Sequence, residues 1–130
     1  MNILLTGATG FIGQALVLEL LQQGFFLTIV LRKKSNLFAD NINQIIVGDL
    51  NNDIDWSSIL NKIDCIIHLA GKAHVIDQTK VSALDEFRKI NTELTLNLAK
   101  QAVAAGVERF IFLSSIGVNG NQNNQPFLEI

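Results

Sequence analysis

The chain has 130 residues, of which 48% are hydrophobic and 17% are charged, and its formal net charge is −2 at pH 7. This length predicts a single domain with a real core, and the weak negative charge excludes the basic surface that nucleic-acid binding requires. No apolar run approaches the roughly 18 residues that span a membrane. The hydrophobic content therefore indicates a sheet that is covered on both faces, whose strands are apolar throughout.

Cysteine and histidine usage narrows the class of protein further. Cys65 is the sole cysteine, so an internal disulfide is excluded, and one cysteine with two distant histidines does not make a zinc site. Met1 leads straight into an apolar segment without a signal peptide, which favours a cytoplasmic location. We expect neither a metal nor a membrane partner.

Apolar, β-rich runs alternate along the chain with helical periodicity, as in the βαβ units of a parallel sheet. A first helix is predicted over about 11–23, ending at Gly24, and a second one from Ser82, where a capping box begins, to Gly106. Residues 55–60 predict a short helix, and the polar segment 119–125 a loop. Strands are predicted near residues 2–6, 26–31, 44–47, 64–69 and 109–114. The predicted fold class is α/β, a doubly wound parallel sheet of Rossmann type with about five strands.

A glycine-rich turn, TGATGFIG at residues 6–13, joins the first strand to the first helix. Glycines let backbone N–H groups close on a phosphate at the positive end of a helix. Strand, turn and helix occur in the order that a dinucleotide pyrophosphate site requires. The predicted cofactor-binding residues of this segment are Gly7, Gly10, Phe11, Ile12 and Gly13. A plain strand-to-helix turn is the simpler alternative.

The second strand ends in Val30-Leu31-Arg32-Lys33-Lys34, which supplies cations where an NAD enzyme usually has a carboxylate for the ribose 2′-hydroxyl. Arg32 could pair with a 2′-phosphate, which favours NADP over NAD as the cofactor. A solvated basic loop is the alternative.

Two later strands end in residues suited to the same ligand. Asp49, after the third strand, could accept a hydrogen bond from adenine or could cap a turn. The fourth strand runs into Leu69-Ala70-Gly71, whose small residues would let the backbone approach the nicotinamide ribose. His68 is flanked by apolar residues, so a satisfied core imidazole is the favoured interpretation and a catalytic base the alternative.

The second helix carries an apolar stripe of Phe87, Ile90, Leu94 and Leu98, and Asn91 falls inside it. A buried amide must find partners, so we expect Asn91 to tie this helix to the loop after the fourth strand. Ser114 and Ser115 end the fifth strand, where they could hydrogen-bond a substrate hydroxyl or carbonyl or simply cap a turn.

The whole chain resembles the extended short-chain dehydrogenase/reductase superfamily, in particular its NAD-dependent epimerase/dehydratase family, which acts on nucleotide sugars. The resemblance rests on TGATGFIG at 6–13, GDL at 48–50, HLAG at 68–71, NTELT at 91–95 and FIFLSSIGVNG at 110–120. It implies that Asp49 and Leu50 contact adenine and that Leu69, Ala70 and Gly71 line the nicotinamide side. It also implies that Asn91, the structural asparagine of the family, and Ser114 belong to the cofactor site, and that Ser115 matches the catalytic serine or threonine of the family.

The base of that family is the tyrosine of a Tyr-x-x-x-Lys motif, and this chain contains no tyrosine. We therefore expect residues 1–130 to be the N-terminal, NAD(P)-binding part of a longer enzyme and to be inactive alone. The resemblance implies that the parent is a nucleotide-sugar 4-epimerase or 4-keto reductase, acting on a UDP-hexose or UDP-N-acetylhexosamine, with a homodimer possible. The alternative is a non-catalytic dinucleotide-binding or sensor protein of the same fold.

Overall fold

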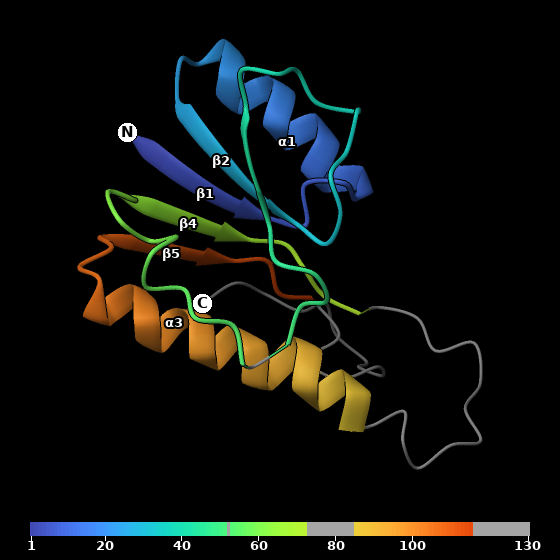
Figure 1. Cartoon of the computed structure of the whole chain (residues 1–130), viewed down its shortest axis with the longest axis vertical. Helices are drawn as coiled ribbons and strands as arrows, with labels where there is room; N and C mark the ends of the chain where they lie inside the picture. Colours follow the sequence, from blue (N-terminus) through green and yellow to red (C-terminus); the bar gives the residue numbers. More distant parts are fainter. Residues whose placement is uncertain (52, 73–84, 116–130) are drawn as a thin grey trace, which may run out of the picture.

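A computed structural model describes residues 1–51, 53–72 and 85–115. Five strands form one parallel sheet in the order β3-β2-β1-β4-β5 (Figure 1). The strands are β1 (Asn2–Thr6), β2 (Phe26–Leu31), β3 (Asn43–Ile46), β4 (Cys65–His68) and β5 (Arg109–Phe112). All five predicted strands are confirmed, with ends that lie within two residues of the predicted ones. The predicted fold class is confirmed as well.

The order of the strands reverses at β1. From β1 the chain proceeds through β2 to β3 on one side, and β4 and β5 follow on the other side. Helix α1 (Phe11–Gln22) covers one face of the sheet and helix α3 (Leu94–Ala104) covers the other (Figure 1). In such sheets the connections beside the reversal leave toward opposite faces, so a crevice opens at the carboxyl ends of the two central strands.

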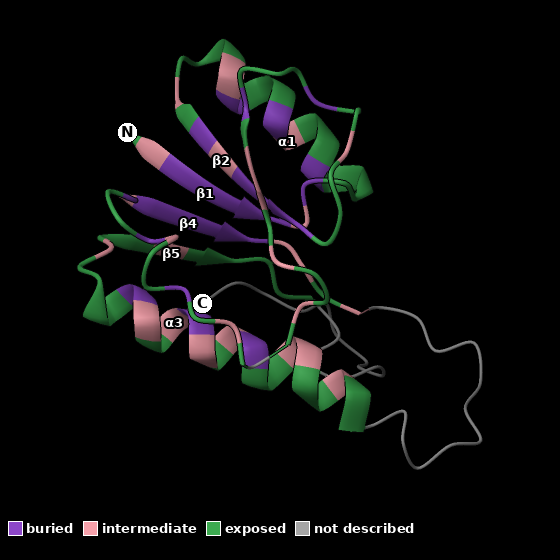
Figure 2. Ribbon diagram, in the orientation of Figure 1, coloured by how far each residue is buried: buried purple, intermediate pink, exposed green. Residues whose placement is uncertain are grey.

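Each face of the sheet has its own hydrophobic core, and Figure 2 shows buried residues along the central strands and on both covering helices. Ile3 and Leu5 of β1 point into the core beneath α1, whereas Leu4, between them, points into the core beneath α3. All three side chains are at most 1% exposed, as are Leu94 and Leu98 of α3. The prediction of a sheet buried on both faces is therefore confirmed for its central strands.

Both helices end as the sequence predicts. Gly24 and Gly106 have positive φ angles of 76° and 75°, which residues with a Cβ rarely adopt. One residue later, Phe25 and Val107 donate their N–H groups to the carbonyls of Leu20 and Ala102, so both ends have the hydrogen bonds of a Schellman motif.

The short helix predicted over residues 55–60 is wrong. These residues form turns, with one helix-like bond from the Leu60 N–H to the Trp56 carbonyl. Side chains of α3 hold the segment: Gln101 accepts the Trp56 N–H at 2.8 Å, and both Gln101 and Asn97 donate to the Ile54 carbonyl at 3.1 Å. Its backbone partners therefore come from α3 and not from a helix of its own.

The second long helix is confirmed where it is described, from residue 85 to Ala104, and contains a π-helical segment, η1 (Arg88–Glu93), that the sequence did not predict. Its predicted start at Ser82 and the polar segment 119–125 lie outside the described residues. Over the ranges that the structure covers, no helix has the length and apolar character to cross a bilayer.

Candidate functional site

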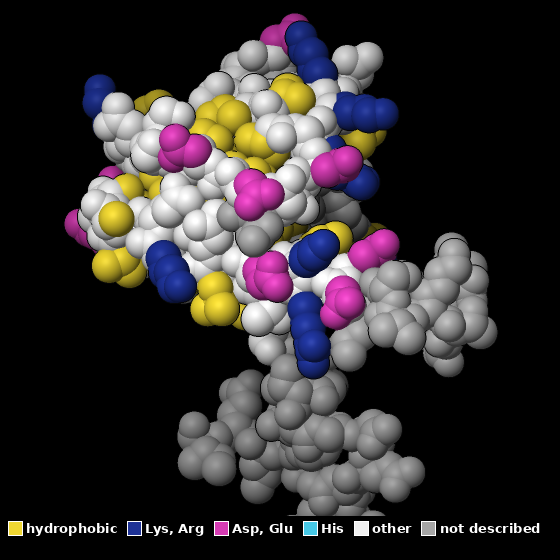
Figure 3. Space-filling model, turned by 60° about the horizontal axis from the view of Figure 1, so that its bottom comes forward, with side chains coloured by type: hydrophobic (Ala, Val, Ile, Leu, Met, Phe, Trp, Pro, Cys, Tyr) yellow, Lys and Arg dark blue, Asp and Glu magenta, His cyan; other side chains and the backbone are white. Residues whose placement is uncertain are grey.

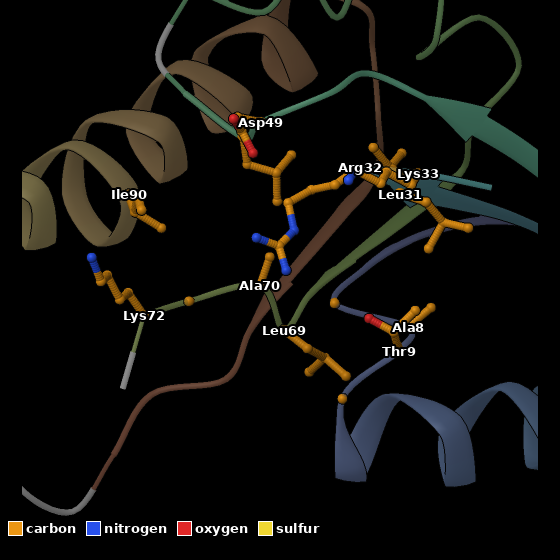
Figure 4. A pocket seen from close by; sticks show the side chains of 15 residues that line it. Ala8, Thr9, Leu31, Arg32, Lys33, Asp49, Leu69, Ala70, Lys72 and Ile90 are labelled. Atoms are coloured by element: carbon orange, nitrogen blue, oxygen red, sulfur yellow. The ribbon is translucent and has the colours of Figure 1, made fainter. Parts of the chain in front are cut away.

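A cavity of about 970 Å³ lies at the carboxyl ends of the strands (Figure 4). Five segments that are distant in sequence line it: the glycine turn after β1, the carboxyl end of β2 with the residues after it, the segment after β3, the loop after β4 and the second long helix. The lining residues are Gly7, Ala8, Thr9, Gly10, Val30, Leu31, Arg32, Lys33, Asp49, Leu50, Leu69, Ala70, Gly71, Lys72 and Ile90. Eight of the predicted cofactor-binding residues are among them: Gly7, Gly10, Arg32, Asp49, Leu50, Leu69, Ala70 and Gly71.

Two glycines of the turn are required by close backbone contacts. Gly7 has a φ of +76°, and a Cβ placed on it would lie 2.7 Å from the Ala70 nitrogen. A Cβ on Gly13 would lie 2.1 Å from the Gly7 carbonyl oxygen and 2.8 Å from Cα of Ala8. Gly7 therefore lets the loop after β4 approach the turn, and Gly13 lets α1 begin directly against it.

The N-terminus of α1 has the properties of an anion site. Gly10 is its N-cap residue, no side chain caps it, and its first turn contains no acidic residue. The Gln14 N–H bonds the Gly10 carbonyl, so the amides of the preceding turn have no acceptor within the helix. These amides and the helix dipole favour a phosphate. A glycine-rich turn at a helix N-terminus fits the pyrophosphate of a dinucleotide.

Across the cavity lie the cation and the carboxylate that the sequence singled out. Arg32 follows the last residue of β2, and its guanidinium extends into the cavity on the side of Ala70 (Figure 4). Asp49 follows Gly48, whose φ is +73°. Both side chains are exposed and line the cavity, where they can contact a ligand.

The loop after β4 is held at both of its ends. The Ala70 N–H donates to Thr6 Oγ1 at 3.2 Å. Asn91 accepts the Lys72 N–H at 2.8 Å and donates to the Lys72 carbonyl at 2.9 Å. The prediction that Asn91 ties its helix to this loop is confirmed. The Lys72 ammonium forms an ion pair with Glu86.

His68 is a satisfied core residue, as the favoured interpretation predicted. Its ring is buried, and its nitrogens lie 2.7 Å from Thr6 Oγ1 and 3.0 Å from Thr95 Oγ1. Burial disfavours the charged imidazolium and lowers the pKa of His68 to about 4, so the ring is neutral at pH 7. Among the described residues, no group of three or more metal-ligating side chains comes together.

The other predicted site residues do not line the cavity. Phe11 and Ile12 begin α1 with side chains 96% and 52% exposed, and Gly13 is buried against the turn. Ser114 and Ser115 follow β5 and are exposed. On the face of the molecule shown in Figure 3, acidic and basic side chains are interspersed and no broad basic patch forms.

Sequence reasoning missed several lining residues. Lys72 follows the HLAG motif directly and Ile90 precedes Asn91, so both are sequence neighbours of predicted site residues. Lys33 belonged to the basic run noted after the second strand. Ala8, Thr9, Val30 and Leu31 complete the set, and their position within the glycine turn and at the end of β2 was the available signal.

A doubly wound parallel sheet with a glycine turn at its point of reversal is the architecture of dinucleotide-binding α/β domains. The NAD dependent epimerase/dehydratase family matches residues 3–129 of this chain. The chain belongs to that family, as its motifs suggested.

Individual relatives agree with the family assignment. A UDP-glucose 4-epimerase from Vibrio cholerae is 42% identical over 120 residues, which are 92% of this chain and 36% of that protein. A Klebsiella pneumoniae protein of the same description is 33% identical over 99% of both chains. The solved structure of MoeE5 in complex with UDP-glucuronic acid and NAD superposes with a TM-score of 0.77 at 30% identity, over 95% of this chain and 40% of MoeE5. The chain thus spans about a third of the Vibrio relative.

Proposed function

We propose that this chain is the NAD(P)-binding portion of a nucleotide-sugar 4-epimerase or 4-keto reductase. One observation carries the proposal: Gly7 and Gly13 permit backbone contacts that no side chain would allow, at a helix N-terminus that lines a cavity of about 970 Å³. The nucleotide-sugar part is supported by relatives described as UDP-glucose 4-epimerases and by the UDP-sugar bound in MoeE5.

In this proposal the cofactor lies across the carboxyl edge of the sheet. The amides of the turn and of the first turn of α1, including those of Phe11 and Ile12, bind the pyrophosphate. The adenine half lies toward Asp49 and Leu50, and the nicotinamide half lies along Leu69, Ala70 and Gly71. Because these residues belong to the ends of different strands, the sheet itself sets the distance between the two halves.

When bound, the nicotinamide supplies hydride transfer to and from C4 of the sugar. The residues of this chain orient that ring, and Ser115, with Ser114 beside it, hydrogen-bonds the reacting oxygen. Removing the hydroxyl proton needs a base, and no tyrosine is present among the 130 residues. We therefore propose that the base belongs to protein beyond these residues, in a parent enzyme of which they form the N-terminal part.

Equilibrium binding tests the cofactor site directly. Titration of the protein with NADH and with NADPH is expected to show saturable one-to-one binding that excess ADP displaces. Absence of binding by both dinucleotides would refute the proposal. Interconversion of UDP-glucose and UDP-galactose, or of the N-acetylated pair, by the full-length protein tests the activity, and loss of that activity in Ser115→Ala tests the serine.

We propose further that Arg32 shifts the preference toward NADP. Its guanidinium extends into the cavity, which Lys33 also lines, so a 2′-phosphate could pair with a cation there. In Arg32→Ala, NADPH affinity is expected to fall by roughly tenfold and NADH affinity to change little. Equal affinities for the two cofactors that the substitution leaves unaltered would refute this preference, and NAD would then be the cofactor.

The absence of tyrosine favours one second candidate, a non-catalytic dinucleotide-binding or sensor protein. The source gene separates the two functions. A Tyr-x-x-x-Lys motif encoded soon after Ile130 supports the enzyme, whereas a stop codon at that point supports the binding protein.

A further inference from the structure

A continuous chain of hydrogen bonds joins β1, β4 and the second long helix through the buried ring of His68. We propose that His68 is a positioning residue, which holds the loop 69–72 where it can contact the nicotinamide half of a bound dinucleotide. The inference rests on the proposed function. It gives a role in ligand binding to a side chain that does not itself line the cavity.

The direction of each of these hydrogen bonds follows from which groups can donate and which can accept. Thr95 Oγ1 donates to the Asn91 carbonyl at 3.0 Å, so it has no proton left for His68 and must accept from the ring Nε2–H at 3.0 Å. The ring Nδ1 then carries a lone pair, and Thr6 Oγ1 donates to it at 2.7 Å. The same Thr6 oxygen accepts the Ala70 N–H at 3.2 Å. Only the neutral Nε2–H tautomer satisfies every group.

This series of hydrogen bonds begins and ends at the two points where the loop 69–72 is held. At one end Thr6 holds Ala70, and at the other end Asn91, whose own carbonyl is bound by Thr95, holds both main-chain groups of Lys72. The ring of His68 therefore connects the two points that fix the loop. A shift of the ring would move or release both of them.

Packing restricts the ring from a third side. It stacks on Phe112 of β5 at a centroid distance of 5.9 Å and lies 6.2 Å from Phe110. An apolar side chain could fill this volume, but it would leave the hydroxyls of Thr6 and Thr95 without their buried partner. A fully satisfied polar network specifies one arrangement of its members more sharply than apolar packing does.

The test uses substitutions of Thr95, which lies on the opposite side of the His68 ring from the bond between Thr6 and Ala70. His68→Leu is the direct change but can prevent folding, because it leaves the proton of the buried Thr6 hydroxyl without its acceptor. Thr95→Val keeps the side-chain volume while removing both hydrogen bonds, and Thr95→Ser restores the hydroxyl. Thr28→Val is the matched control, because the Thr28 hydroxyl also accepts a side-chain hydrogen bond, from Asn43 at 3.2 Å, but lies outside the cavity lining.

Dissociation constants for NADH and for ADP are measured for all folded variants. ADP carries the adenine half alone, so it does not depend on the loop 69–72. Thr95→Val is expected to weaken NADH binding by roughly tenfold and to leave ADP binding unchanged, Thr95→Ser to recover most of the NADH affinity, and Thr28→Val to change neither.

Two results overturn the inference alone: an equal loss for both ligands in Thr95→Val, which indicates general destabilisation, or no loss for either ligand. A wild-type protein that binds neither NADH nor NADPH overturns the proposed function and the inference with it.

Discussion

The closest backbone contact of the site gives the sharpest prediction, for Gly13→Ala. The new methyl group would lie 2.1 Å from the Gly7 carbonyl oxygen and within 2.9 Å of two backbone atoms of Ala8. The helix and the turn must separate by roughly 1 Å or more to reach an ordinary contact distance. Overpacking of this kind costs about 3 kcal/mol, and the higher helix propensity of alanine offsets about 1 kcal/mol. We expect a net loss of about 2 kcal/mol in the free energy of unfolding.

Thermal unfolding followed by far-ultraviolet circular dichroism measures this loss. For a domain of this size, about 2 kcal/mol lowers Tm by roughly 8 °C. Gly10→Ala is the matched control, because its Cβ would meet a single atom at 3.3 Å, and its Tm should fall much less. The separation would also displace the amides at the start of α1, so NADH affinity should fall in Gly13→Ala below its Tm. A Gly13→Ala protein with wild-type Tm and affinity would refute the reasoning.

Three further predictions follow from buried groups. The pKa of His68 in the folded state is about 4, below its usual 6.5, so the free energy of unfolding should fall by about 3 kcal/mol as the pH drops from 6.5 toward 4. Urea unfolding across this pH range should show a smaller fall in His68→Gln, and identical pH profiles for the two proteins would contradict this. Burial raises the pKa of the Cys65 thiol, so a thiol reagent at pH 8 should label it in urea but not in the native protein. Leu98→Ala, at a position that is 0% exposed, should lose about 3 kcal/mol in urea unfolding; Leu96→Ala, on the same helix at 53% exposure, should lose far less, and equal losses would place the core elsewhere.

The strands and the fold class could be predicted from the sequence because they depend on local patterns of apolar residues. Apolar runs mark the strands, and short right-handed connections leave few possible orders. The turn at residues 55–60 could not be predicted in this way. Its sequence suits a helix, but Asn97 and Gln101, more than 40 positions away, supply the partners of its backbone. Tertiary hydrogen bonds overrode the local helix preference, and nothing in the sequence of residues 55–60 predicts those bonds.

The π-helical segment was missed for a related reason. Its residues, Arg-Lys-Ile-Asn-Thr-Glu, carry no helix breaker, so the periodicity predicts a regular helix. Asn91 lies within this segment, and its amide binds the main chain of Lys72, 19 positions earlier. The wider helical turn accompanies that tertiary contact, and π-helical turns are frequent at functional sites. Such a feature becomes visible only once the loop after β4 is in place.

The two ends of the cavity therefore differ in how they are built. The phosphate end is contained in residues 6–13 and forms once β1 and α1 pack together. The opposite end depends on bonds from Thr6 to residues 62 and 64 positions away and on the Asn91 contact with Lys72. With the dinucleotide placed as proposed, loosening β4 or the second long helix should thus weaken binding of the nicotinamide half first, while binding of the adenine half is kept. The ratio of NADH to ADP affinity measures that asymmetry, because stability alone changes both affinities together.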